Sequence, residues 1–321
     1  MEFRKIAELP ECAAEIRHRD RLMLMGSCFS ESMGRMLAGS GFRTLVNPFG
    51  ILYNPASIAL ALDRMLSGKL FGEDELICHG GLWSSLMHHG SFSGTDSGAC
   101  LRHINSSLSE GAEMLRRADW LMITLGTARV YEWKETGTVV GNCHRLPDHK
   151  FSRRLLGVDE IVDEYTALLG RLREGNKELK TLFTVSPIRH TRDGAHGNQI
   201  SKSTLMLAVE KICTTVPQCY YFPSYEIMMD ELRDYRFYCA DMVHPSPVAE
   251  QYIWERFCKA YFRQPTMEAA GECEAVRRGL EHRPLNPDTE DYCRFVAQLE
   301  EKIDRLKKKY PYVETGRLTA G

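Results

Sequence analysis

The sequence predicts an α/β fold built on a parallel sheet, and two observations support this. Short apolar runs recur along the chain, and stretches with the apolar spacing of helices lie between them. Such runs are typical of strands buried on both faces of a parallel sheet, with helices as the crossover connections. The chain has 321 residues, of which 43% are hydrophobic and 26% charged, so we expect one large domain with a sizeable core, with or without an appendage.

Five apolar runs are predicted as strands, and turn-forming residues close each of them. In chain order they cover residues 22–25, 42–46, 120–125, 181–185 and 219–222. The first run ends at Gly26, and the second at the sequence Asn47-Pro48-Phe49-Gly50. Gly126 ends the third, while Pro187 and Pro223 stop the last two. These residue types end strands because they favour turn conformations or cannot donate to the hydrogen-bond ladder.

Helices are predicted between the strands. Pro55 can occupy the first turn of a helix after the second strand, and apolar spacing predicts helices near residues 158–172 and 202–212. Residues 71–118 are rich in Gly, Ser and His and do not follow this alternation, so we expect a long insertion over one edge of the sheet. Residues 131–153 are expected to form a loop or a short hairpin.

The C-terminal segment carries a separate pattern. Apolar residues recur at three- and four-residue spacing over residues 290–309, which predicts an amphipathic helix. That helix either docks back on the domain or pairs with another chain, and its length of only about three heptads favours docking. We therefore expect a main domain over residues 1–265 and a helical extension over residues 266–321, with oligomerisation through the extension as the alternative.

Composition and charge argue against several classes of partner and site. The formal net charge is −2 and no dense Lys/Arg stripe precedes the last helix, so we expect no nucleic-acid partner. No apolar stretch has the length of a membrane span, and the N-terminus lacks the apolar core of a signal peptide. The 11 cysteines are scattered without a Cys-x-x-Cys pair, which argues against a zinc ribbon or a redox motif. We therefore expect a cytoplasmic protein with reduced thiols and no membrane partner.

The junction after the first strand presents a small polar nucleophile. Ser27 lies in the sequence Gly26-Ser27-Cys28-Phe29, between an apolar strand and a stretch with helical spacing. The unpaired N–H groups of a helix N-terminus carry a partial positive charge, so they stabilise an anion that forms on or beside this serine. Considered alone, Ser27 is more simply interpreted as a helix N-cap.

A second signal is the sequence Asp241-Met242-Val243-His244-Pro245-Ser246. An acidic residue three positions before a histidine can hold one imidazole nitrogen while the other faces a nucleophile, as a catalytic triad requires. Considered alone, Asp241 and His244 would be a hydrogen-bonded surface turn. Segments that follow the carboxyl ends of parallel strands gather at one edge of the sheet, however, and both Ser27 and this loop belong there. Together they predict a triad of Ser27, His244 and Asp241.

Several blocks together resemble the GSCFA family. They are Gly26-Ser27-Cys28-Phe29, residues 47–55, residues 124–128, Asn142-Cys143-His144 and residues 186–190. That family is similar to the SGNH (GDSL-type) hydrolases and esterases, named for four blocks that carry Ser, Gly, Asn and His. The resemblance runs over about residues 22–262. It implies a flavodoxin-like, three-layer α/β/α fold of the SGNH hydrolase type and serine-dependent hydrolysis of esters, often O-acyl groups on carbohydrates.

The resemblance also assigns roles at the site. Ser27 takes the position of the nucleophile, His244 that of the general base and Asp241 that of its orienting partner. Gly50 is the candidate glycine of the oxyanion hole, with Gly26 and other glycines as alternatives. The amide of Cys28 at the helix end is expected to contribute to it.

One block departs from the pattern of the wider superfamily. Ala128 stands where an asparagine is usual, so the oxyanion hole lacks a side-chain donor. The loss of one such donor costs about 3–4 kcal/mol of transition-state stabilisation. Asn142, in the loop that follows, is our candidate for the missing amide.

The histidine-containing loops suggest further contacts. A metal site built from His88, His89 and His144 is one hypothesis, but adjacent histidines normally diverge and no acidic partner lies at a recognised spacing. We therefore expect no metal and assign His89 and His144 to a polar substrate cleft. Arg189 and His190 follow a strand-ending proline at the ligand edge, where an arginine can bind a carbonyl or an anionic group. An exposed ion pair within the loop is the alternative for Arg189.

The sequence as a whole predicts a hydrolase of O-acyl esters that needs no cofactor, with a small-molecule or carbohydrate ester as substrate. Two alternatives stay open. One is an O-acyltransferase that uses the same triad with a sugar hydroxyl in place of water. The other is a carbohydrate- or ligand-binding module that keeps the fold and has lost turnover, which Ala128 suggests.

Overall fold

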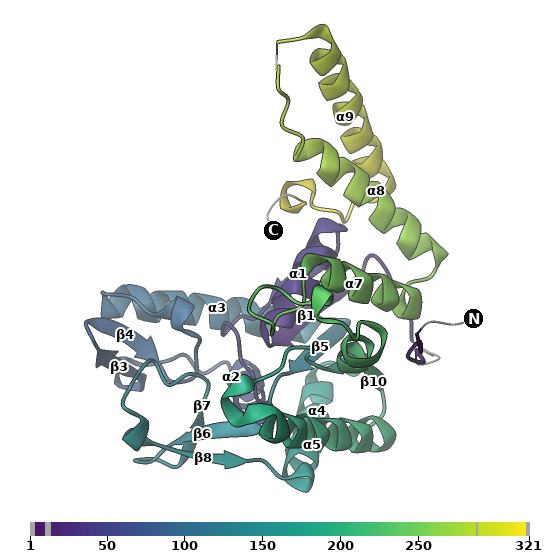
Figure 1. The fold of residues 1–321 in the computed structure, drawn as a ribbon. Helices are drawn as coiled ribbons and strands as arrows, with labels where there is room; N and C mark the ends of the chain where they lie inside the picture. The colour runs from purple at the N-terminus through teal and green to yellow at the C-terminus, as the bar shows by residue number, and fades with distance from the viewer. Residues whose placement is uncertain (1–3, 10–13, 287, 319–321) are drawn as a thin grey trace.

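A five-stranded parallel sheet forms the centre of the computed structural model, which describes residues 4–9, 14–286 and 288–318 (Figure 1). In chain order its strands are β1 (Arg21–Gly26), β2 (Arg43–Val46), β5 (Trp120–Leu125), β9 (Lys180–Val185) and β10 (Cys219–Phe222). They lie side by side in the order β10-β9-β5-β1-β2, and every pairing is parallel. This is the strand order of a flavodoxin-like doubly wound sheet, so the predicted fold class is confirmed.

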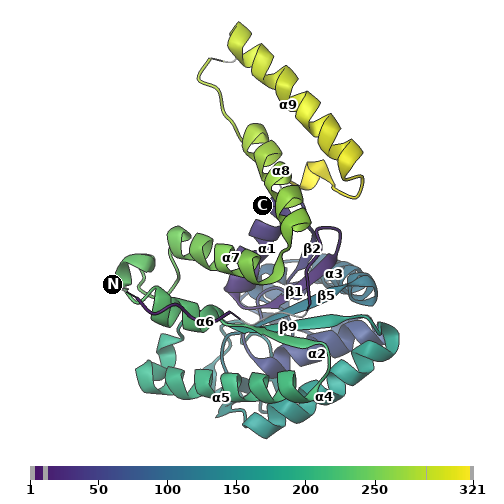
Figure 2. The same ribbon diagram turned by 90° about the vertical axis from the view of Figure 1, so that its right-hand side faces the viewer.

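Helices cover both faces of this sheet, which gives three layers (Figure 2). On one face lie α2 (Pro55–Ser67), α3 (Ser97–Arg117), α4 (Val158–Gly175) and α5 (Gly194–Thr215). On the other lie α1 (Cys28–Gly39) and α7 (Pro247–Tyr261). Successive side chains of β1 point to opposite faces of the sheet. Met23 and Met25 therefore pack in the hydrophobic core on the first face, while Leu22 and Leu24 pack in the core on the other.

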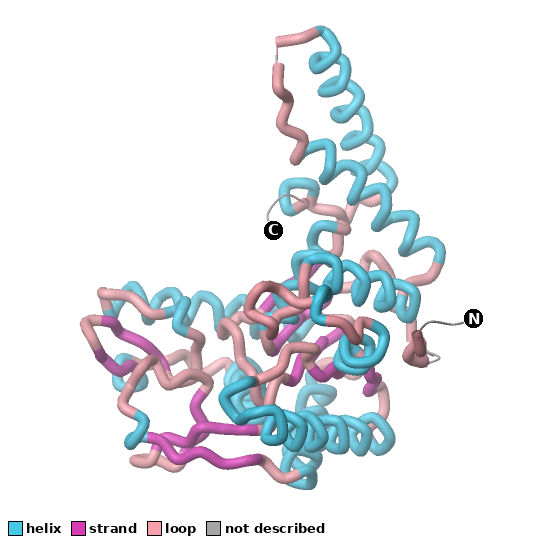
Figure 3. Tube along the Cα trace, viewed as in Figure 1, coloured by secondary structure: helices cyan, strands magenta, loops and turns pink. Residues whose placement is uncertain are grey.

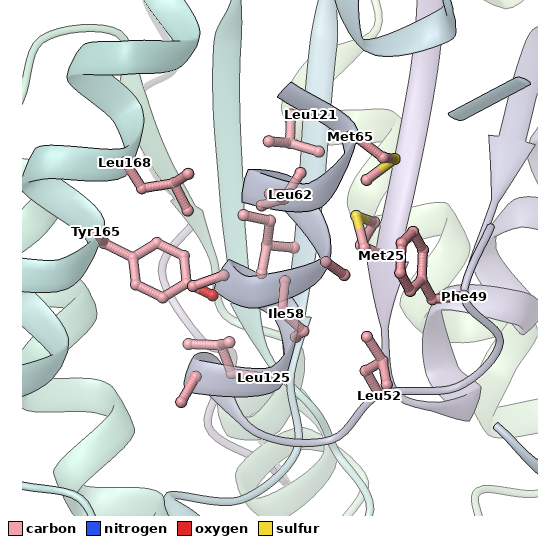
Figure 4. Packing of buried hydrophobic residues seen from close by; sticks show 14 of the residues in the cluster. Met25, Phe49, Leu52, Ile58, Leu62, Met65, Leu121, Leu125, Tyr165 and Leu168 are labelled. Atoms are coloured by element: carbon pink, nitrogen blue, oxygen red, sulfur yellow. The ribbon is translucent and has the colours of Figure 1, made fainter. Parts of the chain in front are cut away.

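Helix α2 begins as the sequence indicates. Pro55 occupies its first turn, and the side-chain oxygen of the preceding Asn54 accepts a hydrogen bond from the Ser57 amide at 2.8 Å. Its apolar face packs between the sheet and α4, as Figure 4 shows for Ile58 and its neighbour Tyr165. The Tyr165 hydroxyl donates to the Pro55 carbonyl at 3.1 Å, so this buried polar group is satisfied.

Residues 71–118 contain more regular structure than we expected. A hairpin of β3 (Leu76–His79) and β4 (Leu82–Ser85) comes first, and the long helix α3 follows and packs on β1 and α2. The buried face of α3 is a narrow stripe with residues mostly four apart, namely Cys100, Ile104, Leu108 and Ala112. Its many Gly and Ser residues hide that stripe in the sequence, so the expectation of an insertion outside the helix–strand alternation was wrong for this helix.

A small antiparallel sheet occupies the segment predicted as a loop or short hairpin. The hairpin of β6 (Arg129–Trp133) and β7 (Thr138–Val140) is present, and β8 (Phe151–Leu155) adds a third strand on the other side of β6. Figure 3 shows these strands at some distance from the parallel sheet, linked to it by loops.

The C-terminal residues form a helical hairpin that projects from the three-layer domain (Figures 1 and 2). Its helices are α8 (Gln264–Leu280) and α9 (Glu290–Lys309), the second with the bounds that the apolar spacing predicts. Helix α9 packs on α8, where Leu299 meets Gly279, rather than on the sheet domain. The segment after α9 returns to the domain, and the Tyr312 hydroxyl lies 3.2 Å from Nδ1 of His18. The domain boundary at residue 265 and oligomerisation through α9 stay predictions.

Among the described residues, no helix combines the length and the apolar character that crossing a membrane requires.

Gly26 generates the first testable prediction. Its φ is +136°, and a β-carbon there would lie 2.1 Å from the Thr124 carbonyl oxygen. We expect Gly26→Ala to lower the free energy of unfolding by about 3 kcal/mol or more, through backbone strain and this clash. The measurement is urea unfolding followed by circular dichroism.

Gly170 provides the matched control, because it lies within α4 and a β-carbon there would contact nothing within 4 Å. Gly170→Ala should leave stability unchanged or raise it by about 1 kcal/mol. Equal unfolding midpoints for the two variants would contradict the constraint at Gly26.

Candidate active site

Ser27 caps helix α1 at the point where β1 ends. Its Oγ accepts a hydrogen bond from the Phe29 amide at 3.3 Å, and its own amide donates to the Thr124 carbonyl at 3.2 Å. The N-cap interpretation is therefore confirmed. The residue is only 1% exposed. It lies at the carboxyl end of β1, beside the end of β5, which is the switch point where flavodoxin-like sheets bind ligands.

Asp241 and His244 make the predicted contact. Nδ1 of His244 donates to Asp241 Oδ2 at 2.6 Å, while the amides of Val243 and His244 both donate to Asp241 Oδ1 at 2.9 Å. These two amides lower the pKa of Asp241 to about 2, and the imidazole adds to the shift. The carboxylate thus stays ionised at neutral pH and fixes the tautomer whose Nε2 is free to accept a proton.

The loop that carries this pair lies next to the start of α1. Ser246, two residues after His244, caps α7 by accepting from the Ala249 amide at 3.3 Å. In the first turn of α7, Glu250 accepts a hydrogen bond from the Ser32 hydroxyl of α1 at 2.6 Å. The N-terminal parts of these two helices, which are neighbours in Figure 1, are therefore in contact. Within the described residues, no hydrogen bond joins Ser27 to His244.

Three glycine amides near Ser27 already have acceptors. The Gly50 amide donates to the Asn47 carbonyl at 2.7 Å, the Gly26 amide to the Asn47 side chain at 2.8 Å, and the Gly126 amide to the Tyr53 carbonyl at 2.7 Å. The Gly50 amide is thus already engaged in this turn, and its assignment to the oxyanion hole stays a prediction. The φ of +72° at Gly50 and the close approach of His89 explain the glycine at this position.

The amide and the thiol of Cys28 differ in what they can contribute to a reaction. Cys28 is the first residue of α1, where a backbone N–H has no acceptor within the helix. That amide is thus a suitable donor toward an oxyanion beside Ser27. Burial raises the pKa of the Cys28 thiol, so the sulfur is protonated and a poor nucleophile.

A cavity of about 240 Å³ opens beyond the end of β5, and Tyr53, Asn142 and His190 are among the residues that line it. The Asn142 side-chain oxygen accepts from the His144 amide at 2.8 Å, which leaves the NH₂ group as the free end. Ala128 is fully buried, and its amide donates to Ser201 Oγ at 2.8 Å. Position 128, where the wider superfamily has an asparagine, is therefore part of the core. Asn142 stays our candidate for the missing side-chain donor.

His190 adds a second candidate donor in this cavity. Its Nε2 is buried without a hydrogen-bond partner, and a β-carbon on Gly126 would lie 3.1 Å from it. The ring packs edge-on against Tyr53 at 5.4 Å. Burial lowers the pKa of His190 to about 4, and the charges of Lys202 and His244 act in the same direction. A neutral imidazole with an unpaired ring nitrogen therefore faces the site.

The other predicted polar residues have contacts of their own. His144 Nε2 lies 2.8 Å from the Ser85 carbonyl and His89 Nδ1 lies 3.1 Å from Ser91 Oγ, so one nitrogen of each ring is already engaged. Their assignment to the substrate cleft stays a prediction. Arg189 contacts Met229 Sδ at 2.9 Å and lines a separate cavity of about 470 Å³, so it diverges from its neighbour His190.

His88 belongs to the core. It is fully buried, stacks on Phe49 at 4.4 Å, and its Nδ1 lies 3.0 Å from Ser85 Oγ. Burial lowers the pKa of His88 to about 3, which keeps the ring neutral. In the part of the chain that the structure describes, no three His, Cys, Asp or Glu side chains converge to form a candidate metal site.

Sequence reasoning did not assign Lys202 or Tyr53. Lys202 is fully buried and donates to the Ser186 carbonyl at 2.8 Å, and burial lowers its pKa to about 7. Nothing in the helical pattern around Lys202 distinguishes it from an exposed lysine. Tyr53 lies in a block that carries the family resemblance, and that block could have indicated a place for Tyr53 in the site.

Comparison with known proteins places the chain in a family. The model described as the GSCFA family matches residues 21–257, and the model described as the GSCFA domain protein, C-terminal domain, matches residues 273–318. The chain belongs to the GSCFA family. No curated protein matches this GSCFA chain.

Solved structures similar to the GSCFA chain share little sequence with it. A Streptococcus pneumoniae protein whose name refers to platelet activating factor is 10% identical, with a TM-score of 0.38, and the match covers 76% of this chain and 84% of that one. A carbohydrate esterase family 3 protein from Talaromyces cellulolyticus is 12% identical, with a TM-score of 0.36 and coverage of 74% and 94%. The acetyl xylan esterase Est2A from Butyrivibrio proteoclasticus is 11% identical, with a TM-score of 0.37 and coverage of 76% and 63%.

The Asp241 environment gives a prediction about pH. Because its pKa is lowered to about 2, ionised Asp241 stabilises the loop above its ordinary value of 3.8, and this contribution disappears as the pH falls toward 2. The carboxyl carbon signal of Asp241 should titrate with a midpoint near 2. In His244→Ala the midpoint should rise but remain below 3.8, since both amide hydrogen bonds persist. A midpoint of 3.8 in the unmodified protein would refute the arrangement.

The lack of a converging ligand set gives a second prediction. Treatment with EDTA should leave both the melting temperature and any esterase activity unchanged. Elemental analysis that finds one tightly bound zinc per chain, held by His88, His89 or His144, would overturn this expectation.

Proposed function

We propose that this GSCFA protein is a serine-dependent hydrolase of O-acyl esters, with Ser27 as nucleophile, His244 as general base and Asp241 as its orienting partner. The alcohol in this proposal is a carbohydrate or another small molecule, as the resemblance to SGNH hydrolases implies. The reaction needs no cofactor.

One observation carries the proposal. The hydrogen bond between Ser32, in the second turn of α1, and Glu250, in the first turn of α7, holds the N-terminal parts of the two helices together. Ser27 caps the first of these helices, and the Asp241–His244 pair immediately precedes the second. Two segments that are distant in sequence thus supply a nucleophile and a paired imidazole to the same edge of the sheet.

The reaction would proceed by an acyl-enzyme. Ser27 Oγ attacks the acyl carbonyl while His244 Nε2 accepts its proton, and Asp241 stabilises the imidazolium that forms. The imidazolium then protonates the leaving alcohol. Water enters, loses a proton to His244 and releases the acid, which restores the serine.

The oxyanion would be held by donors from three segments. The Cys28 amide stands at the N-terminus of α1, where the helix dipole also favours negative charge. The NH₂ group of Asn142 and the Nε2–H of neutral His190 are the side-chain donors in place of the absent asparagine.

In the proposed mechanism, the buried Ser27 must become accessible to the substrate. Ser27 is 1% exposed, whereas the side chains of Asp241 and His244 are each 50% exposed. The proposal therefore includes a movement that uncovers Ser27 Oγ and brings His244 Nε2 to it. Catalytic hydrogen bonds often form only in the substrate complex, so their absence from an unliganded arrangement is compatible with this mechanism.

Two other functions use the same geometry. An O-acyltransferase would admit a sugar hydroxyl in place of water, and a binding module would lack turnover altogether. The burial of Ser27 and the alanine at position 128 favour the second. Covalent labelling of Ser27 by an organophosphonate would exclude the binding module.

The cysteines among the described residues are free thiols, which supports a reducing compartment such as the cytoplasm as part of the proposal.

Substitution of the triad tests the proposal. On a panel of p-nitrophenyl and acetylated-sugar esters, Ser27→Ala and His244→Ala should each lower kcat/KM by about 10⁴-fold or more, because triad members act as a unit. For the same reason the double variant should be little worse than either single one.

Exposed residues of the same types provide controls. Ser91→Ala and His196→Ala should retain full activity, since both residues are exposed and lie outside the proposed site. Circular dichroism should show native folds for all variants. If Ser27→Ala keeps a tenth or more of the activity, the serine mechanism is wrong.

A further inference from the structure

Three arginines line the 240 Å³ cavity that Tyr53, Asn142 and His190 also border. Arg129 comes from β6, Arg153 from β8, and Arg192 from the short 3₁₀ helix Thr191–Asp193. Segments from three parts of the chain thus direct their guanidinium groups to one small space.

The charges of this lining do not balance. Asp193 is the carboxylate among these residues, and it lies 2.5 Å from Arg153 Nη1 and 3.4 Å from Arg129 Nε. Three positive charges against one negative leave a formal charge of +2. Arg192 also has Asp148 at 3.7 Å, but that carboxylate is 90% exposed and weakens the field little.

Unpaired polar atoms face the same space. The Tyr131 hydroxyl and His190 Nε2 are buried without a hydrogen-bond partner among the described residues, and both residues line the cavity. Arg129 Nε is buried there too, with the Asp193 carboxylate at 3.4 Å outside hydrogen-bond geometry. A buried donor left without a hydrogen bond costs about 1–3 kcal/mol, so these atoms suit a bound group that accepts hydrogen bonds.

Two of the arginines also share one aromatic ring. The guanidinium carbons of Arg153 and Arg192 lie 5.2 Å and 5.4 Å from the ring centre of Tyr131. Two cations on one ring repel each other, and an anion between them would remove that repulsion. All the unpaired atoms can donate hydrogen bonds, which suits an oxyanion.

We propose that this cavity binds a negatively charged oxyanion group of the substrate, a carboxylate, phosphate or sulfate, so that the preferred esters are acidic molecules. The specificity for the acidic group rests on the proposed esterase function, whereas binding of the anion does not. His190 connects the two, because it lines the cavity and lies close enough to His244 for the charge of that imidazole to act on it. The acidic group would anchor the substrate with its ester bond directed toward Ser27.

Kinetics on a matched pair of esters test the specificity. The 4-nitrophenyl monoester of adipic acid carries a terminal carboxylate, and 4-nitrophenyl hexanoate has the same chain length without it. We expect kcat/KM to favour the acidic ester by about tenfold or more, as a charge-assisted contact provides. Arg192→Gln should reduce that ratio toward one. A ratio of one in the unmodified protein would overturn the proposal.

A control separates local contacts from general charge. Arg102 is 77% exposed on α3, outside the cavity, so Arg102→Gln removes the same charge without touching the site. The ratio should be unchanged in this variant, and an equal loss in Arg102→Gln and Arg192→Gln would refute the site. Tyr131→Phe keeps the ring and removes only the unpaired hydroxyl, so it should weaken binding of an anion by about threefold or more.

Direct binding distinguishes failure of this proposal from failure of the esterase proposal. Calorimetry with monomethyl adipate, inorganic phosphate and sulfate at constant ionic strength should detect binding of at least one anion, and dimethyl adipate should not bind. Whichever anion binds identifies the acidic group. Binding that Arg192→Gln weakens would support the cavity even in the absence of turnover, whereas no binding by any of the three anions would refute it.

Discussion

The backbone leaves the parallel sheet at Gly26, and the position of Ser27 depends on how that turn is held. The Gly26 amide donates to the Asn47 side chain, its carbonyl accepts from the Leu52 amide at 3.0 Å, and the Ser27 amide donates to Thr124. These bonds connect the end of β1 to the loop after β2 and to β5. Helix α1 therefore starts at a fixed place and in a fixed direction, with Ser27 at its tip. The sheet and the loop after β2 together present this serine at the switch point.

Two neutral histidines connect the loops around this turn. His88 stacks on Phe49, and His144 reaches the Ser85 carbonyl from the segment after β7. The Leu86 carbonyl in turn accepts from the amides of residues 141 and 142. The position of Asn142 at the cavity therefore depends on the insertion that follows β2. Because burial keeps these rings uncharged, the support does not change with pH in the neutral range.

Sequence patterns predicted the features of this protein that are local or periodic. The apolar runs located all five strands of the parallel sheet, because β1, β5 and β9 are buried on both faces and the edge strands β2 and β10 are at least partly buried. The Asp241–His244 contact could be predicted since its partners are only three positions apart in the sequence. Helix α3 could not be predicted, because its buried stripe is narrow and its composition resembles that of a loop. The acceptors of the Gly50 and Gly26 amides were equally hidden, since a hydrogen-bond partner is a property of the folded backbone. The arginine cavity depends on the pairing of β6 with β8, which no spacing in the chain reveals.

The distance in sequence between Ser27 and the Asp241–His244 pair also has a consequence for biosynthesis. Four strands of the parallel sheet are complete once residue 185 has been made, and the fifth strand ends at residue 222. The helix that positions the loop is α7, which starts only at Pro247. A nascent chain can therefore assemble the whole sheet, with its serine in place, while the imidazole is still inside the ribosome. In the proposed triad, Ser27 would therefore meet His244 late in synthesis, so its reactivity would arise only when the three-layer domain is nearly finished.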